Sequence, residues 1–278
     1  LIEQADKALG ESLSAVMFEG PGEELTRTCN CQPALYVHGL ACLAVLKELV
    51  PSLNPVAAAG LSLGEFTAHA AAGTYSFEEG LRLVQKRGAF MEEACNATKG
   101  TMAAMIGGTD ENVIKLAQEC DVDVANFNCP GQTVVSGTEE GVAKAVAGAK
   151  AAGCKIAKKL NVAGAYHSRL MHSAMVKLAE ELKNISFGTP SMPVYCNYEA
   201  RVVEGPDDIR SMLEHQVCGS VRWTASMQKL VDQGHRLFIE LGPGKTLVGI
   251  MARICKEATV ISIEDVPSLE AAVAELNK

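Results

Sequence analysis

Apolar and polar positions along the chain predict helices and strands in alternation. Apolar residues recur with helical spacing over residues 40–49, and two prolines interrupt this pattern before the short apolar run 56–59. A glycine-rich turn then leads back into helical spacing, and Ser76 with Glu79 three residues later predicts the start of a further helix. This part of the chain is therefore expected to contain a strand at 56–59 and helices at 40–49, 65–72 and 77–95.

The pattern changes between residues 101 and 162, where short apolar runs with strand character enclose two helical segments. The expected strands are 102–106, 122–127, 133–136 and 155–160, and the expected helices are 111–120 and 139–152. The order strand, helix, strand, strand, helix, strand is typical of a ferredoxin-like unit. We therefore expect a small ferredoxin-like (βαββαβ) subdomain over residues 99–164.

The alternation of longer helices and buried strands resumes after His167. Strands are expected at 192–197 and 236–241, and helices at 168–183, 209–216, 224–232 and 246–255. The fold class is α/β, with a hydrolase-like core that contains a parallel sheet and into which the subdomain is inserted. The core is expected to comprise residues 1–98 and 165–278.

Composition narrows the possible functions. Of 278 residues, 48% are hydrophobic and 21% charged, which is typical of a globular protein. The formal net charge is -8, so nucleic acid is not an expected partner. No uninterrupted apolar stretch approaches the roughly 18 to 20 residues of a membrane span, so neither a membrane nor a membrane partner is expected. The ten cysteines are scattered and lack metal-ligand spacing, which indicates free thiols, no bound metal and a cytoplasmic location.

Residues 60–64, with the sequence Gly-Leu-Ser-Leu-Gly, match the G-x-S-x-G pattern of a nucleophilic serine on a turn between a strand and a helix. Ser62 is the candidate nucleophile, and the backbone N–H of Leu63, at the start of the helix, is the candidate donor to an oxyanion. A purely structural glycine turn is the alternative, and the predicted strand and helix on either side make it less favoured. Leu61 supplies no base, so the base must come from elsewhere in the chain.

Six histidines are candidates for that base, and His167 stands apart because it follows the last strand of the predicted subdomain. His172 is the second choice. Arg87 lies in a helix with an otherwise apolar face, where it is either a solvated cation or a planar fork that binds a carboxylate through two hydrogen bonds. Periodicity alone does not decide between these two interpretations of Arg87.

Five stretches of the sequence, in their order along the chain, resemble those of the malonyl-CoA:acyl carrier protein transacylases. Residues 18–21 and 28–35, which lie upstream of them, are similar as well. The resemblance therefore covers essentially the whole chain. The five are Gly-Leu-Ser-Leu-Gly-Glu-Phe at 60–66, Gln-Lys-Arg-Gly at 85–88, Asn-Phe-Asn-Cys-Pro-Gly-Gln at 126–132, Gly-Ala-Tyr-His-Ser at 164–168 and Glu-Leu-Gly-Pro-Gly-Lys at 240–245.

The resemblance implies a ping-pong reaction in which Ser62 accepts a malonyl group from malonyl-CoA and passes it to the phosphopantetheine thiol of acyl carrier protein for fatty-acid synthesis. It implies His167 as the base, oriented by the backbone carbonyl of Gln216. No cofactor is expected beyond the coenzyme A thioester that serves as substrate, and the enzyme is expected to act as a monomer. The substrate-binding residues that it implies are Arg87 for the malonyl carboxylate, Tyr166 against a methyl branch, and Asn126.

Two departures from the family pattern stand out. Leu61 occupies a position where many members have histidine, which is expected to alter packing rather than chemistry. The family's N-terminal Gly-Gln-Gly segment, which supplies a strand and a glutamine beside the oxyanion hole, is not in this sequence, and an intact protein is expected to carry it.

Three other functions remain open from the sequence. They are a serine esterase or thioesterase of the α/β-hydrolase type, an acyltransferase of a polyketide pathway, and a non-catalytic domain that docks a carrier protein. Because carrier proteins are acidic, we also expect a local basic patch on this acidic chain. Its candidate residues are Lys86, Lys155, Lys158, Lys159 and Arg169.

Overall fold

The computed structural model describes all 278 residues, which divide into two compact units. Unit 1 comprises Leu1–Gly88, Ile185–Tyr195 and Gln228–Lys278, and unit 2 comprises Ala89–Asn184 and Cys196–Met227. Helices α6 (Phe77–Ala97) and α11 (Trp223–Asp232) each cross from one unit into the other. The domain boundaries expected from the sequence remain a prediction.

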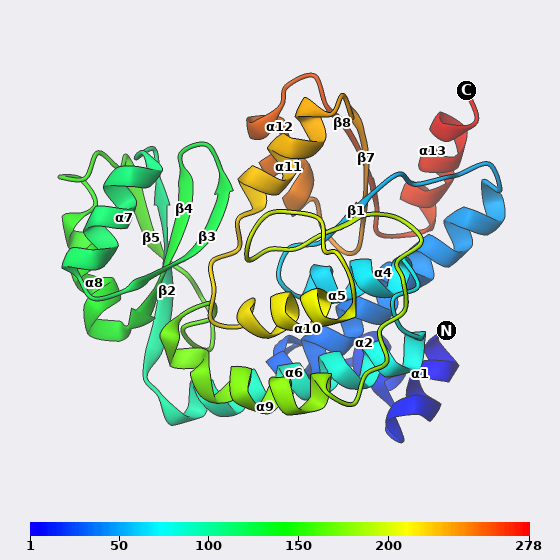
Figure 1. Cartoon of the computed structure of the whole chain (residues 1–278), viewed down its shortest axis with the longest axis horizontal. Helices are drawn as coiled ribbons and strands as arrows, with labels where there is room; N and C mark the ends of the chain where they lie inside the picture. The colour runs from blue at the N-terminus through cyan, green and yellow to red at the C-terminus, as the bar shows by residue number, and fades with distance from the viewer. The chain divides into compact units, whose positions relative to one another are not determined.

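Unit 1 is a mixed α/β unit with two short parallel sheets (Figure 1). In one, Ala58 and Ala59 of β1 pair with Val194 and Tyr195 of β6; in the other, β7 pairs with β8 along its whole length. The strands expected at 56–59 and 192–197 are therefore only two residues long. The elements are α1 (Ile2–Leu9), α2 (Leu13–Glu19), α3 (Gly22–Thr26), α4 (Thr28–Leu49), β1 (Ala58–Ala59), α5 (Leu63–Ala71), β6 (Val194–Tyr195), β7 (Leu237–Leu241), α12 (Thr246–Ile254), β8 (Thr259–Ile263) and α13 (Val266–Leu276).

Helix α4 is the longest element of unit 1, and it packs against α5, β7 and α13. Its residues Tyr36, Val37 and Leu46 are fully buried, and Leu46 belongs to an apolar cluster with Ile263 and Ala272. By length and composition alone α4 could also cross a membrane, which the sequence analysis did not anticipate. A core helix of a soluble protein meets the same criterion, and Leu46 of α4 is buried together with residues of β8 and α13.

Unit 2 contains a four-stranded antiparallel sheet in the order β3-β4-β2-β5. Helices α7 and α8 lie on one face of this sheet (Figure 1), where Met105, Leu116, Val135 and Val142 form a buried core. The elements in chain order are β2 (Gly100–Ile106), α7 (Asp110–Glu119), β3 (Asp123–Cys129), β4 (Gln132–Thr138), α8 (Glu139–Gly148), β5 (Ile156–Lys159), the 3₁₀ turn η1 (Arg169–Met171), α9 (His172–Leu182) and α10 (Pro206–His215).

The structure corrects the sequence-based assignment at both ends of the region after His167. The helix expected directly after His167 begins only at His172, because the 3₁₀ turn η1 at Arg169–Met171 precedes it. Strand β8 and helix α13 were not predicted. Asp265 caps α13 by accepting a hydrogen bond from the backbone N–H of Ser268, a start signal that the sequence analysis overlooked.

Candidate active site

Ser62 lies on a strained turn between strand β1 and helix α5. Its backbone angles are φ 55° and ψ −109°, a conformation that costs a non-glycine residue on the order of 1–3 kcal/mol. The turn is tight: a Cβ atom on Gly60 would lie 1.9 Å from the carbonyl carbon of Gly64. Only glycine fits at position 60, so the first glycine of G-x-S-x-G is a steric requirement of the turn that presents the serine hydroxyl, whereas a Cβ on Gly64 would meet nothing within 4 Å.

Arg87 donates a hydrogen bond to this serine. Its Nη2 lies 3.1 Å from Ser62 Oγ, and its side chain is 1% exposed, which excludes the interpretation of Arg87 as a solvated surface cation. The guanidinium carbon also lies 5.0 Å from the centre of the Phe66 ring. A planar, permanently charged donor is thus held beside the nucleophile, where a carboxylate attached through an acyl group would meet it.

Gln32 is a site residue that was not predicted from the sequence, although it lies in the family-like stretch 28–35. Its Oε1 accepts a hydrogen bond of 2.6 Å from Arg87 Nη1, and both side chains are buried. Because a guanidinium has donors and no acceptor, the amide oxygen rather than the amide nitrogen must face it. Gln32 lies on α4, 55 residues before Arg87, so only the tertiary fold reveals the pair.

His167, in unit 2, is the histidine whose surroundings fit a general base. It is buried, and its Nδ1 lies 2.9 Å from the backbone carbonyl oxygen of Gln216. Since a carbonyl can only accept, Nδ1 carries the proton and Nε2 carries the lone pair that a base needs. Gln216 follows the last residue of α10, so its carbonyl lies at the negative end of a helix and favours the imidazolium that forms when His167 takes up a proton.

The turn that carries His167 is held by its neighbour Ser168. The Ser168 hydroxyl donates to the backbone oxygen of Ala165 at 2.6 Å and accepts from the backbone N–H of Leu170 at 3.2 Å. The first of these bonds spans the positive-φ residue His167, and the second holds the chain after it. The fallback candidate, His172, is exposed at the start of α9.

The remaining predicted site residues have the following places. Leu63 is the first residue of α5, and its N–H is among the four amides at a helix start that lack an intrahelical acceptor. Tyr166 packs against Met102 on the face of the unit 2 sheet opposite α7 and α8. Asn126 lies at an irregularity of β3 where its backbone bridges to Val221.

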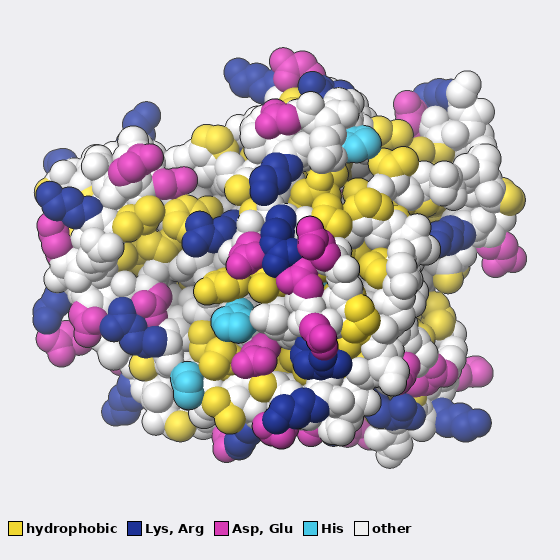
Figure 2. Space-filling model, viewed as in Figure 1, with side chains coloured by type: hydrophobic (Ala, Val, Ile, Leu, Met, Phe, Trp, Pro, Cys, Tyr) yellow, Lys and Arg dark blue, Asp and Glu magenta, His cyan; other side chains and the backbone are white.

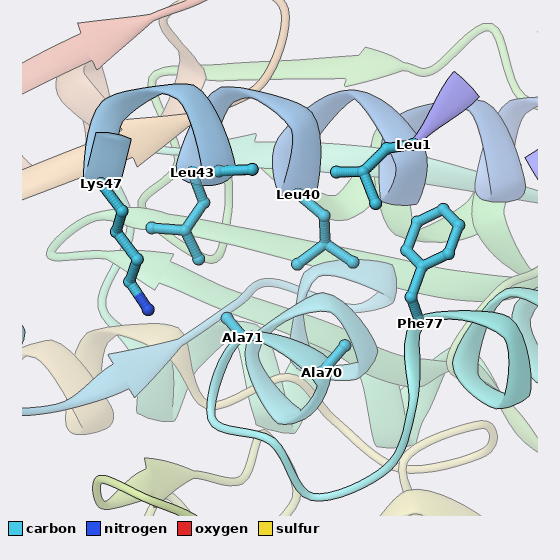
Figure 3. Close-up of a pocket in the computed structure, with 8 residues that line it drawn as sticks. Leu1, Leu40, Leu43, Lys47, Ala70, Ala71 and Phe77 are labelled. Atoms are coloured by element: carbon cyan, nitrogen blue, oxygen red, sulfur yellow. The ribbon is translucent and has the colours of Figure 1, made fainter. Parts of the chain in front are cut away.

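An apolar pocket of about 250 Å³ lies elsewhere in unit 1, between α4 and α5 (Figure 3). Leu40, Leu43 and Lys47 line it from α4, Ala70 from α5, and Phe77 from the start of α6. Lys47 is the one charged residue in its lining, and neither Ser62 nor Arg87 takes part. The pocket therefore does not coincide with the candidate site.

Two residues of the expected basic patch have acidic partners. Arg169 forms ion pairs with Asp121 at 2.7 Å and Asp123 at 2.8 Å, and these carboxylates raise its pKa further. Lys159 lies 3.5 Å from Glu139. Figure 2 shows basic and acidic side chains intermixed on the face that it presents. Lys155 and Lys158 are exposed in the same unit and remain candidates for contact with an acidic partner.

The whole chain is similar to proteins of one known family. The family model described as acyl transferase domain matches residues 1–275. The chain belongs to this acyl transferase family. Among its relatives are the malonyl CoA-acyl carrier protein transacylases of Bacillus subtilis, 40% identical over 100% of this chain and 89% of the relative, and of Escherichia coli K12, 40% identical over 98% and 89%. The resemblance stated from the sequence is thereby confirmed.

Solved structures of the same family are also similar to this chain. The malonyl CoA-acyl carrier protein transacylase of Coxiella burnetii matches with a TM-score of 0.95 and 33% identity, over 100% of this chain and 89% of that one. A malonyl-transacylase solved in complex with a type II polyketide acyl carrier protein matches with a TM-score of 0.95 and 36% identity, over 99% and 90%. The mixed α/β fold with parallel sheets is therefore that of the family.

Proposed function

We propose that this chain transfers the malonyl group of malonyl-CoA to the phosphopantetheine thiol of an acyl carrier protein through a malonyl ester on Ser62. The observation that carries the proposal is the buried Arg87 guanidinium donating to Ser62 Oγ. In malonyl-serine the free carboxylate carbon lies three covalent bonds from Oγ. A cation held beside Oγ is therefore within reach of that carboxylate and of no comparable group in an acetyl ester.

In the first half-reaction, Ser62 Oγ attacks the thioester carbon while its proton passes to Nε2 of His167. The N–H of Leu63 stabilises the resulting oxyanion. The carbon–sulfur bond then breaks, and coenzyme A leaves with the proton from His167. In the second half-reaction the carrier thiol gives its proton to His167 and attacks the ester carbon. Ser62 leaves and regains its proton, so atoms and charges balance over the cycle.

Arg87 fixes the malonyl carboxylate through parallel hydrogen bonds, and Gln32 sets the plane of the guanidinium. Tyr166 and Asn126 are the further residues that we expect to bind substrate, Tyr166 against a methyl branch. The carbonyl of Gln216 keeps His167 in the tautomer that accepts a proton at Nε2.

Fatty-acid synthesis is the pathway that we favour. A polyketide transacylase of Bacillus subtilis is 39% identical over 93% of this chain, so the relatives include both pathways. We also infer that unit 1 forms a hydrolase-like core and that the β2 to β5 region forms a ferredoxin-like subdomain. The strand order β3-β4-β2-β5, with both helices on one face, supports the latter.

The test is a transfer assay with malonyl-CoA and phosphopantetheinylated carrier proteins of both pathways. The proposal expects transfer that is abolished in Ser62→Ala and His167→Ala and strongly reduced in Arg87→Ala. Release of malonate to water at the same rate with and without carrier would instead favour an esterase. Sedimentation at several concentrations tests the expectation of a monomer.

A further inference from the structure

The turn after helix α10 presents a carbonyl group to the candidate base. Gln216 is the first residue after α10, and its backbone oxygen lies 2.9 Å from Nδ1 of His167. The turn, residues 215–219, is closed by a hydrogen bond of 2.8 Å from the N–H of Gly219 to the carbonyl oxygen of His215. Gln216 and His167 both belong to unit 2. The place of the Gln216 carbonyl, and with it the hydrogen bond to His167, therefore depends on what holds this turn.

Tyr198 packs against the turn at both of its ends. Its ring stacks on the imidazole of His215, with the ring centroids 5.3 Å apart and the planes inclined by 23°. At the other end, a Cβ atom on Gly219 would lie 2.3 Å from Cδ2 of Tyr198 and 2.8 Å from the His215 carbonyl oxygen. The φ of Gly219 lies outside the left-handed region, so close packing rather than backbone conformation requires glycine there. The Tyr198 ring thus occupies the space that a side chain at position 219 would need.

The two stacked residues are themselves anchored to the backbone. Nδ1 of His215 lies 2.7 Å from the carbonyl oxygen of Ser211, so it donates to that oxygen and holds the imidazole over the last turn of α10. The backbone oxygen of Tyr198 accepts a hydrogen bond of 2.9 Å from Nε of Arg222, which lies just beyond the turn. The stack therefore links two fixed segments of backbone across the turn that carries Gln216.

We propose that Tyr198 is a positioning residue for His167, on which it acts through the turn that carries Gln216. The inference rests on the proposed function, in which His167 is the general base. His167 offers a lone pair at Nε2 only while Nδ1 keeps its proton on the Gln216 carbonyl. A turn without the Tyr198 ring is free to move that carbonyl away, and a misplacement of about 1 Å can lower a rate about 100-fold. Tyr198 is therefore expected to support catalysis from outside the reacting groups.

Removal of either ring tests the inference through the kinetics of malonyl transfer. Tyr198→Leu cannot stack, and we expect it to lower kcat about 10- to 100-fold with an unchanged KM for malonyl-CoA, because the Gln216 carbonyl acts on the base and not on the malonyl carboxylate. Tyr198→Phe keeps the ring and should match the wild type. His215→Ala removes the other ring and should give a similar loss. The double variant His215→Ala with Tyr198→Leu should lose no more than either single variant, because both remove the same contact.

A spectroscopic measurement separates positioning from general destabilisation. In proton NMR spectra, the Nδ1–H of His167 is assigned by its absence in His167→Ala. In Tyr198→Leu this signal should move upfield or exchange with water, because its hydrogen bond to the carbonyl is weaker. Phe187→Leu is the control, since Phe187 packs edge-on against Tyr75 in unit 1. Its replacement should lower the thermal stability but leave kcat and the His167 signal unchanged.

The possible outcomes decide between the inference and the function on which it rests. A fall in kcat of less than about threefold in Tyr198→Leu, smaller than the loss of a typical hydrogen bond, would overturn the inference. A loss confined to KM, an equal loss in Tyr198→Phe, or an unmoved Nδ1–H signal would also overturn it. If His167→Ala leaves malonyl transfer unchanged, the proposed function fails instead.

Discussion

Replacing Gln32 by leucine tests the geometry of the site most sharply. Leucine is close to glutamine in size but cannot accept a hydrogen bond, so Gln32→Leu keeps the packing of α4 and removes the 2.6 Å bond to Arg87 Nη1. The guanidinium then keeps its contact with Ser62 and its stacking on Phe66 but loses the acceptor that fixes its plane. A carboxylate bound through two parallel hydrogen bonds depends on that plane.

The size of the effect follows from the burial of both partners. A hydrogen bond to a charged group contributes about 1.5–3 kcal/mol, and a buried N–H left without a partner adds its own cost. The expected result is a fall of about 10- to 150-fold in kcat/KM for malonyl-CoA. Because Arg87 holds the carboxylate in both the ground state and the transition state, most of the fall should appear as a higher KM.

The assay measures initial rates of malonyl transfer to the carrier protein over a range of malonyl-CoA concentrations. Labelling of Ser62 by an uncharged phosphonate, which has no carboxylate, should change little, and the exposed Gln118→Ala serves as the matched control. A fall in kcat/KM of less than about threefold, below the value of a typical buried hydrogen bond, would refute the assigned role of Gln32. An equal loss toward the phosphonate would show that Gln32 acts on the nucleophile instead.

Three further predictions concern other parts of the chain. Gly60→Ala places a Cβ 1.9 Å from Gly64, so the variant should lose malonyl transfer and unfold at a lower temperature, as calorimetry would show; an unaltered Tm and rate would contradict the steric account. Burial lowers the pKa of His69 to about 4, so the fold requires its neutral form: stability is fully present above about pH 6.5 and falls by about 3 kcal/mol as the pH drops toward 4. In urea titrations the stability of the wild type relative to that of His69→Phe should therefore fall by about this amount over the same pH range, and parallel curves would contradict this. Charge reversal of exposed Lys158 to Glu should weaken transfer to the carrier while leaving Ser62 acylation by malonyl-CoA unchanged; equal carrier transfer would exclude Lys158 from docking.

The nucleophile turn could be predicted from sequence because it is local. Gly60, Ser62 and Gly64 are neighbours in the chain, and the strain at Ser62 is set by the turn that they form. The order of helices and strands in unit 2 was also predictable, since each element carries its own periodicity. Strand length was not: β1 ends where its pairing with β6 ends, and pairing is a property of two distant segments.

Interactions between distant segments account for what the sequence left open. From sequence alone, Arg87 could be a surface cation or a residue that binds a carboxylate. In the structure, Gln32 of α4 and Ser62 of the turn both contact its guanidinium. From sequence alone, Arg169 is a candidate for a basic patch. In the structure it forms ion pairs with Asp121 and Asp123. In both cases the partner lies at least 25 positions away, beyond the reach of periodicity.

The central claim is that Ser62 carries a malonyl ester whose carboxylate is held by Arg87, and trapping that ester tests it most directly. The protein is incubated with malonyl-CoA, measured by intact mass, digested to locate the added group, and in parallel chased with phosphopantetheinylated carrier protein. The account predicts one malonyl group on the peptide that contains Ser62, much less of it in Arg87→Ala, and its loss to the carrier during the chase. No adduct on Ser62, or an acetyl group from acetyl-CoA accepted as readily as malonyl, would contradict it.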